Sequence, residues 1–153
     1  MSCTSSIGPA QTVTGMLFQV GNGSSPETMN TIANATDLTL PVKTDVVDVT
    51  AFCDQWHRKI PTLNDMGKIT CKIYWVMEEP THRNSVNGGT VGAGLRYLLV
   101  NRLLRDYQFV YPDGNSSTDA FPAYCTMFSI TGKVGGVFEA SAEFDNSGAP
   151  SLV

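Results

Sequence analysis

The sequence of 153 residues is poor in charge and very poor in histidine. Charged residues make up 16% of the chain, against roughly 25% in an average soluble domain, so uncharged polar residues must cover much of the surface. The formal net charge of −4 argues against a protein that grips nucleic acid through phosphate contacts, which requires a basic excess. Two histidines leave few candidates for a general base.

Long apolar runs and a leader-like N-terminus are also missing. No stretch approaches the roughly 18 apolar residues of a membrane span, and residues 1–11 have neither a basic start nor an apolar core. We therefore expect no membrane span and a protein made in the cytoplasm. The four cysteines form no Cys-x-x-Cys pair, so we expect reduced thiols and no structural zinc site.

No motif for catalysis or for cofactor binding stands out. Cys53 and His57 lie close together, but no second pair of ligands accompanies them. The glycines of residues 88–94 lack the pattern of a phosphate-binding loop. Glu78 and Glu79 are sequence neighbours that point apart on an extended chain. We expect no enzyme, no metal and no cofactor.

The chain is instead rich in segments with the two-residue period of β-strands. The clearest is 68–77, where apolar and polar residues alternate. Strands are predicted at 16–20, about 30–40, 44–52, 68–77, 107–111, 120–131 and 137–145. Residues 1–15 are predicted to form a flexible arm and 146–153 a short tail.

One segment has helical rather than strand periodicity. Leu95, Leu98, Leu99 and Leu103 share a face, which predicts a helix over 94–106 with cations in its last turn. Residues 53–67 and 78–92 show no period and are predicted to be long loops. The expected fold is a single domain, 1–153, that is mainly β: an antiparallel β-sandwich or partly closed barrel flanked by one α-helix.

Charge is distributed unevenly along the chain. The first 42 residues contain no Lys or Arg, segment 90–105 is purely basic, and segment 106–153 carries six acidic residues against Lys133 alone. This asymmetry suits head-to-tail contact between identical copies, because the basic patch of one chain can meet the acidic patch of the next. Ordinary solvated surface is the alternative.

The C-terminal half carries a recognisable order of motifs. A leucine-rich segment at 95–105 is followed by Tyr-Pro-Asp-Gly at 111–114, Ser-Ile-Thr-Gly-Lys at 129–133, Phe-Glu-Ala-Ser-Ala-Glu-Phe at 138–144 and Asn-Ser-Gly-Ala-Pro at 146–150. This order resembles the tail tube (major tail) proteins of long-tailed bacteriophages. The resemblance covers roughly residues 94–150 by motif and the whole chain by element order and length.

The resemblance implies a structural protein of the virion tail, assembled in the host cytoplasm. Such proteins form six-fold rings that stack into a hollow tube, through which DNA passes without specific binding. The partners implied are further copies of the chain and other tail proteins, such as the tape measure, initiator and terminator. Glu139 and Glu143 are the candidates for the lumen. The candidates for contacts between subunits and rings are Arg58, Lys59, Asp65, Glu78, Glu79, Arg83, Arg96 and Arg105.

Other functions stay open from the sequence. A tail terminator or the tube protein of a contractile system would share the ring-forming fold. A sugar- or ligand-binding β-sandwich would use Trp56, Tyr74 and Tyr124 as an aromatic platform. A hydrolase would use Cys53 and His57.

Overall fold

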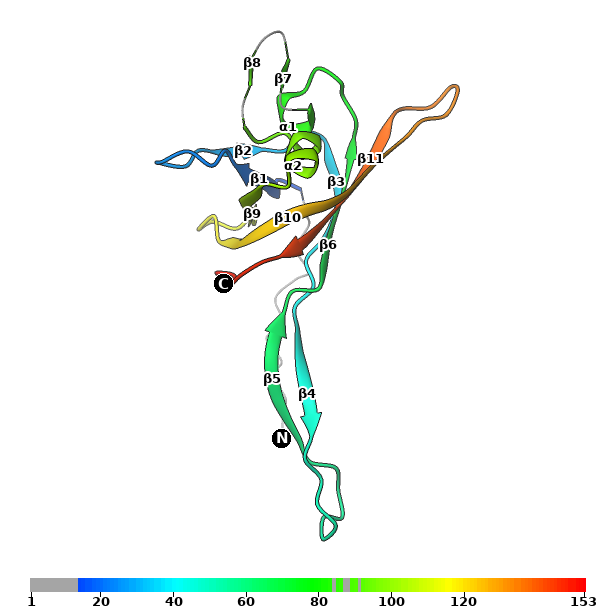
Figure 1. Cartoon of the computed structure of the whole chain (residues 1–153). Helices are drawn as coiled ribbons and strands as arrows, with labels where there is room; N and C mark the ends of the chain where they lie inside the picture. The colour runs from blue at the N-terminus through cyan, green and yellow to red at the C-terminus, as the bar shows by residue number, and fades with distance from the viewer. Residues whose placement is uncertain (1–13, 84, 87–88, 91) are drawn as a thin grey trace, which may run out of the picture.

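A computed structural model describes residues 14–83, 85–86, 89–90 and 92–153 of the chain (Figure 1). Most of the N-terminal segment 1–15, which was predicted to be flexible, therefore lies outside the described residues. The fold is mainly β and antiparallel with minor helices, as predicted. Its helices are α1 (Pro80–Arg83) and α2 (Leu95–Asn101). Its strands are β1 (Leu17–Gly21), β2 (Met29–Thr31), β3 (Ala35–Thr39), β4 (Lys43–Asp48), β5 (Lys59–Asp65), β6 (Lys68–Tyr74), β7 (Ser85–Val86), β8 (Gly89–Thr90), β9 (Leu104–Val110), β10 (Thr118–Thr131) and β11 (Glu139–Asn146).

The body is built on one seven-stranded sheet with the order β2-β1-β9-β10-β11-β6-β3. Every neighbouring pair is antiparallel. The long strands β10 and β11 form its centre, and α2 packs on the side of β10. The predicted turns at 112–115 and 132–136 are confirmed, since they join β9 to β10 and β10 to β11.

The two edges of the sheet are held together by one short connection. Strands β2 and β3 occupy opposite edges, yet only residues 32–34 separate them in the chain. Within this link the Ile32 N–H donates to the Phe18 carbonyl (2.8 Å), and the Asn34 carbonyl accepts from the Tyr74 N–H (3.1 Å). The sheet must therefore curl until its edges nearly meet, which makes it the partly closed barrel predicted from the sequence.

The inside of this curled sheet is packed with aromatic rings. Phe18 lies 4.7 Å from Phe109, and Tyr107 lies 4.7 Å from Phe144, measured between ring centroids. All four side chains are fully buried. Leu95 and Leu98 of α2 are buried in the same core, as the leucine stripe predicted.

Three sequence predictions about element bounds are wrong. The predicted strand 30–40 is two strands, because Asn34 takes the left-handed conformation (φ 57°) between them. The predicted loop 53–67 contains β5, which pairs with β4 and is exposed on both faces. The predicted loop 78–92 contains α1, β7 and β8.

The predicted helix 94–106 is also too long. It ends at Asn101, where Arg102 adopts a left-handed C-cap (φ 54°) and its N–H bonds back to the Leu98 and Leu99 carbonyls. Leu104 and Arg105 then belong to strand β9. The predicted last-turn cations Arg102 and Arg105 therefore lie beyond the helix.

The C-terminal tail is bound to the body. Ala120 and Ser151 exchange two backbone hydrogen bonds of 2.9 and 2.7 Å, so the tail extends the pairing beside β10. The buried Asp119 carboxylate accepts the Val153 N–H (2.8 Å) and the Tyr111 hydroxyl (2.5 Å). Burial and this bond raise the pKa of Tyr111 to about 12.

Candidate assembly surfaces

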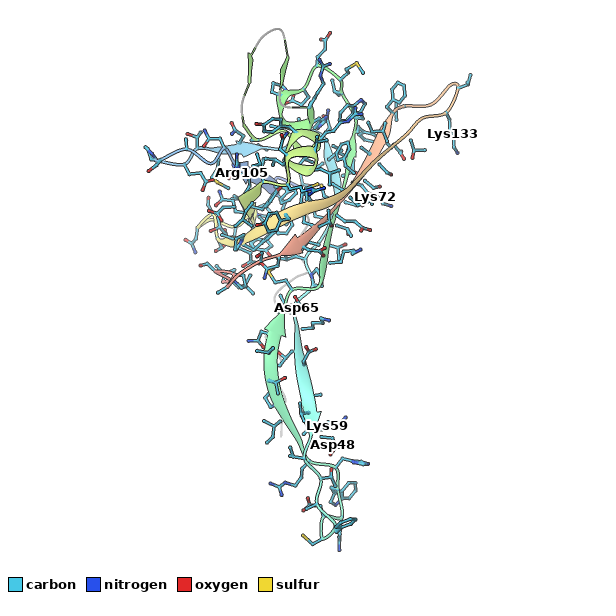
Figure 2. All side chains as sticks on the ribbon, viewed as in Figure 1. Asp48, Lys59, Asp65, Lys72, Arg105 and Lys133 are labelled. Atoms are coloured by element: carbon cyan, nitrogen blue, oxygen red, sulfur yellow. The ribbon has the colours of Figure 1, made fainter. Side chains whose placement is uncertain are left out.

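The most distinctive surface is a hairpin that leaves the body, residues 43–65, called the arm below (Figure 1). It continues the edge pair of the sheet: Thr39 opposes Thr70 in β3–β6, and after a short break Lys43 opposes Asp65 in β4–β5. Figure 2 shows Asp65 at the base of the arm, with Asp48 and Lys59 toward its far end. Every residue of β4 and β5 is exposed.

Both faces of the arm carry apolar side chains. Val46 opposes Pro61 on one face, and Val47 opposes Ile60 on the other, because successive residues of a strand point to opposite sides. Leu63 adds to the exposed apolar surface, and its exposed fraction is 74%. The arm therefore exposes apolar side chains on both of its faces.

The far end of the arm presents two aromatic side chains to solvent. Phe52 is fully exposed and the exposed fraction of Trp56 is 84%. The turn between them is nevertheless ordered by polar contacts: the Asp54 carboxylate accepts the Ala51 N–H (2.8 Å) and lies 3.6 Å from Arg58. The aromatic rings are thus held outward by a structured loop.

The Cys53–His57 pair that a hydrolase would need is not formed. The imidazole of His57 lies 3.3 Å from the Asp48 carboxylate, and no hydrogen bond joins it to Cys53 among the described residues. Hydrogen bonds from Thr50 hold the pKa of Asp48 below its ordinary value. In the described part of the chain, no group of three or more His, Cys, Asp or Glu side chains could hold a metal ion.

A second apolar surface lies at the opposite end of the sheet, formed by Val76, Met77, Ile130 and Phe138 and called the end patch below. Ile130 and Phe138 continue the core-facing alternation of β10 and β11 past the end of the core. The Phe138 carbonyl accepts the Trp75 N–H (2.9 Å), which places Val76 and Met77 beside it. The exposed fraction of Phe138 is 61%.

The outer side of the sheet is polar and holds both predicted lumen residues. Glu139 and Glu143 project from the same face of β11, and buried alanines alternate with them. Glu143 lies 2.9 Å from the Lys68 ammonium, and this hydrogen bond raises the pKa of Lys68. Across β3, β6 and β11 this polar face carries four carboxylates and two ammonium groups: Asp37, Glu139, Glu143, Asp145, Lys68 and Lys72.

The predicted contact residues fall on different parts of the molecule. Arg58, Lys59 and Asp65 lie on the arm, where Asp65 pairs with Lys43 at 3.6 Å. Arg83 and Arg96 are exposed on α1 and α2.

The other predicted contact residues are Glu78, Glu79 and Arg105. Glu78 is exposed beside the end patch, whereas Glu79 accepts hydrogen bonds from the N–H and hydroxyl of Thr81 and so caps α1. Arg105 is half-buried and donates to the Gly92 carbonyl (3.3 Å). Within the described residues Arg105 therefore already has an internal partner.

The three aromatic side chains that a ligand-binding platform would use do not lie together. Trp56 is on the arm, whereas Tyr74 and Tyr124 oppose Glu139 and Asp145 near the two ends of β11. Six residues of extended strand separate these positions by roughly 20 Å. None of the helices that the structure describes is long and apolar enough to cross a membrane.

The apolar surfaces of the arm and the end patch were not found from the sequence, although two signals were present. The alternation Phe138, Ala140, Ala142, Phe144 predicts one continuous core-facing row, and only the fold shows that Phe138 lies past the core. Val46 and Val47 are consecutive residues, so their side chains point to opposite faces of a strand, which is inconsistent with a single buried face.

The sequence matches no family model and no curated protein. The fold, however, is similar to that of chains in tail particles. The tail of the empty gene transfer agent particle, refined with C6 symmetry, contains a chain with a TM-score of 0.73 at 16% identity, covering 94% of this chain and 99% of that one. A chain in the six-fold symmetrised baseplate of the anti-feeding prophage has a TM-score of 0.63 at 10% identity, covering 96% and 98%.

A third similar chain belongs to the sheath/tube terminator of an extracellular contractile injection system, with a TM-score of 0.59 at 10% identity and coverage of 95% and 97%. These likenesses span nearly the whole of each chain. The protein therefore has the tail-tube-like fold that is found in phage-like particles and contractile injection systems.

Proposed function

We propose that this protein is the structural subunit of the tail tube of a phage-like particle. Copies assemble into six-membered rings that stack into a hollow tube, and the particle's DNA passes through it to the recipient cell. Support for this function comes from the shared fold, whose relatives include a C6-symmetric tail.

The arm is the observation that carries the proposal. A two-stranded hairpin is at best marginally stable alone in water, yet here its residues are exposed and both of its faces carry apolar side chains. Exposed apolar surface of this kind marks sites of protein association. A subunit that meets several identical neighbours explains an arm with two faces to cover.

The polar face of the sheet is the proposed wall of the lumen. Its excess of carboxylates over ammonium groups gives a surface that repels phosphate, so DNA slides past without sticking. Glu139 and Glu143 would supply part of this charge, with Lys68 offsetting Glu143 at 2.9 Å. Proposed partners besides further copies are the tape measure, initiator and terminator of the same tail.

A terminator or a contractile-system tube protein is the second candidate, because similar chains occur in a sheath/tube terminator and in a tube-terminating cap. The two functions predict different products. A terminator forms a single ring, whereas a tube subunit forms rings that stack without a fixed limit.

Negative-stain electron microscopy of the concentrated protein, with light scattering on the same sample, tests this proposal. Hollow tubes or stacked six-fold rings are expected, single rings favour the terminator, and a monomer at all concentrations contradicts both. Val47→Asp on the arm should prevent assembly because it places a charge in a buried contact. Val47→Ile, which keeps an apolar side chain at the same exposed position, is the matched control and should still assemble.

A further inference from the structure

We propose that the arm of one copy docks on the end patch of the next copy, with Phe52 and Trp56 packing against Ile130 and Phe138. This inference rests on the proposed function, since it specifies which two surfaces meet when copies assemble. In the part of the chain that the structure describes, all four side chains are exposed.

The two surfaces lie at opposite ends of one strand. The arm joins β6 through Met66 and Gly67 at its Lys68 end, and the end patch begins just after Tyr74 at the other end. Figure 1 shows the arm and the β10–β11 hairpin extending in opposite directions from the body. Figure 2 places Lys133 at the outer end of that hairpin, far from Asp48 and Lys59 of the arm.

This placement determines the type of interface. An arm cannot reach the end patch of its own chain, because the body lies between them. A copy displaced along β6, however, brings its arm to the end patch of its neighbour. Such a contact is heterologous, and it repeats from copy to copy instead of closing after two.

The chemistry of the two surfaces is compatible with this contact. Docking removes aromatic and aliphatic surface from water on both sides, which is the main favourable contribution to association. Charge adds little to this contact, because the exposed cations beside Trp56 already have acidic neighbours on the arm: Arg58 lies 3.6 Å from Asp54, and Lys59 opposes Asp48.

Pairing of two arms with each other is the competing arrangement. It would cover the arms but leave Ile130 and Phe138 in solvent, although these side chains continue the core-facing row of β10 and β11. Docking of the arm on the end patch covers both surfaces at once.

The thiol of Cys53, beside Phe52 at the end of the arm, allows a direct test by disulfide cross-linking. Cys53 is exposed, whereas Cys71 and Cys125 are buried. In a Cys3→Ser background, Ile130→Cys places a second thiol in the end patch. The matched control is Thr131→Cys, which is also exposed but lies on the opposite face of the same strand. Met77→Cys is a second reporter in the end patch.

Each variant is oxidised at a concentration where light scattering shows that the Cys3→Ser chain assembles, and is then run on a non-reducing gel. Ile130→Cys or Met77→Cys should shift the monomer band into a ladder of dimers, trimers and larger species. The Thr131→Cys control should not, because its side chain points to the opposite face of β10 and a disulfide cannot form between Cβ atoms that point apart.

The possible results separate the two proposals. Tubes or rings without a ladder, or an equal ladder from Thr131→Cys, would overturn the docking and leave the proposed function intact. Dimers alone in every variant would indicate that two arms pair through Cys53. This result would also overturn the docking of the arm on the end patch. A chain that stays monomeric would contradict the proposed function, and the docking with it.

Discussion

Among single residues, His82 has the most consequential position. It is fully buried, its ring stacks on Trp75, and its Nδ1 accepts the Val76 N–H (3.2 Å). The proton is therefore on Nε2, which donates to the Ala33 carbonyl (2.8 Å) in the link between the two sheet edges. One neutral imidazole thus joins α1 and the end of β6 to the connection that keeps the sheet curled.

Replacing this imidazole should be costly. His82→Ala leaves the Ala33 carbonyl and the Val76 N–H without their partner and opens a cavity, so we expect the free energy of unfolding to fall by about 2–4 kcal/mol. Urea denaturation measures this change. His57→Ala, on the exposed arm, is the matched control and should change it by less than about 0.5 kcal/mol. Equal losses from the two variants would contradict the assigned role.

The buried thiols predict a specific dependence of stability on pH. Burial raises the pKa of both Cys71 and Cys125 from 9.0 to about 12. The folded chain then keeps both thiols neutral while the unfolded chain ionises them, so stability is complete below pH 9 and falls as the pH rises toward 12. At about pH 10 the loss should reach about 1.4 kcal/mol for each thiol.

The double variant Cys71→Ala, Cys125→Ala isolates this effect. Its free energy of unfolding should fall by about 3 kcal/mol less than that of the natural chain between about pH 8 and pH 10. The measurement is urea denaturation under reducing conditions at both pH values. Parallel pH dependence of the two proteins would show that the buried thiols are not responsible.

At the scale of elements, periodicity predicted those strands that have a buried face. Strand β6 and the pair β10–β11 were predicted because core-facing residues such as Ile69, Ile73 and Phe144 alternate with polar ones. Strand β5 could not be predicted, because neither of its faces is buried and its residues carry no period. The end of α2 was predicted wrongly, because the residue that ends this helix in the left-handed conformation is Arg102 instead of a glycine.

The row of apolar residues on β11 allows a comparison within one element. Phe144 is fully buried against Phe18 and Tyr107, whereas Phe138 follows the same alternation outside the core. Phe144→Ala should lower the free energy of unfolding by about 3–5 kcal/mol, as measured by urea denaturation. Phe138→Ala should leave the stability of the monomer nearly unchanged and reduce assembly, as measured by light scattering.

The result for Phe138→Ala tests whether this side chain lies outside the core, as its exposure indicates. Normal assembly together with a large loss of monomer stability would place Phe138 in the core of the chain, contrary to its exposure. Ser129→Ala, on the polar side of β10, is a suitable control because neither stability nor assembly should change.

At the scale of the whole molecule, the chain has a compact body and two exposed apolar surfaces, the arm and the end patch. The charge asymmetry of the sequence predicts head-to-tail contact at charged residues, and this stays a prediction. The proposed contact of arm and end patch joins two copies, so no pattern within one chain relates residues near 52 to residues near 138. Candidate lumen residues were easier to propose, because the sequence shows which residues of β11 form its polar face.

A heterologous contact between arm and end patch predicts how two defective chains behave when mixed. Trp56→Asp impairs the arm but keeps a working end patch, and Phe138→Asp does the opposite. Each alone should fail to build long assemblies, because a buried carboxylate without a partner opposes the contact. When they are mixed, the intact arm of the Phe138→Asp chain docks on the intact patch of the Trp56→Asp chain.

The product exposes only the arm of the Trp56→Asp chain and the end patch of the Phe138→Asp chain. Both of these surfaces carry the substitution, so growth must stop. Light scattering of the mixture should show a single step of association, approximately doubling the mass of the species that each variant forms alone, and no tubes. Two chains of the same variant cannot associate in this way, because both lack the same intact surface. A mixture that stays at the starting mass would contradict docking of arm on patch, and growth of long tubes from either variant alone would show that these side chains are not part of the contact.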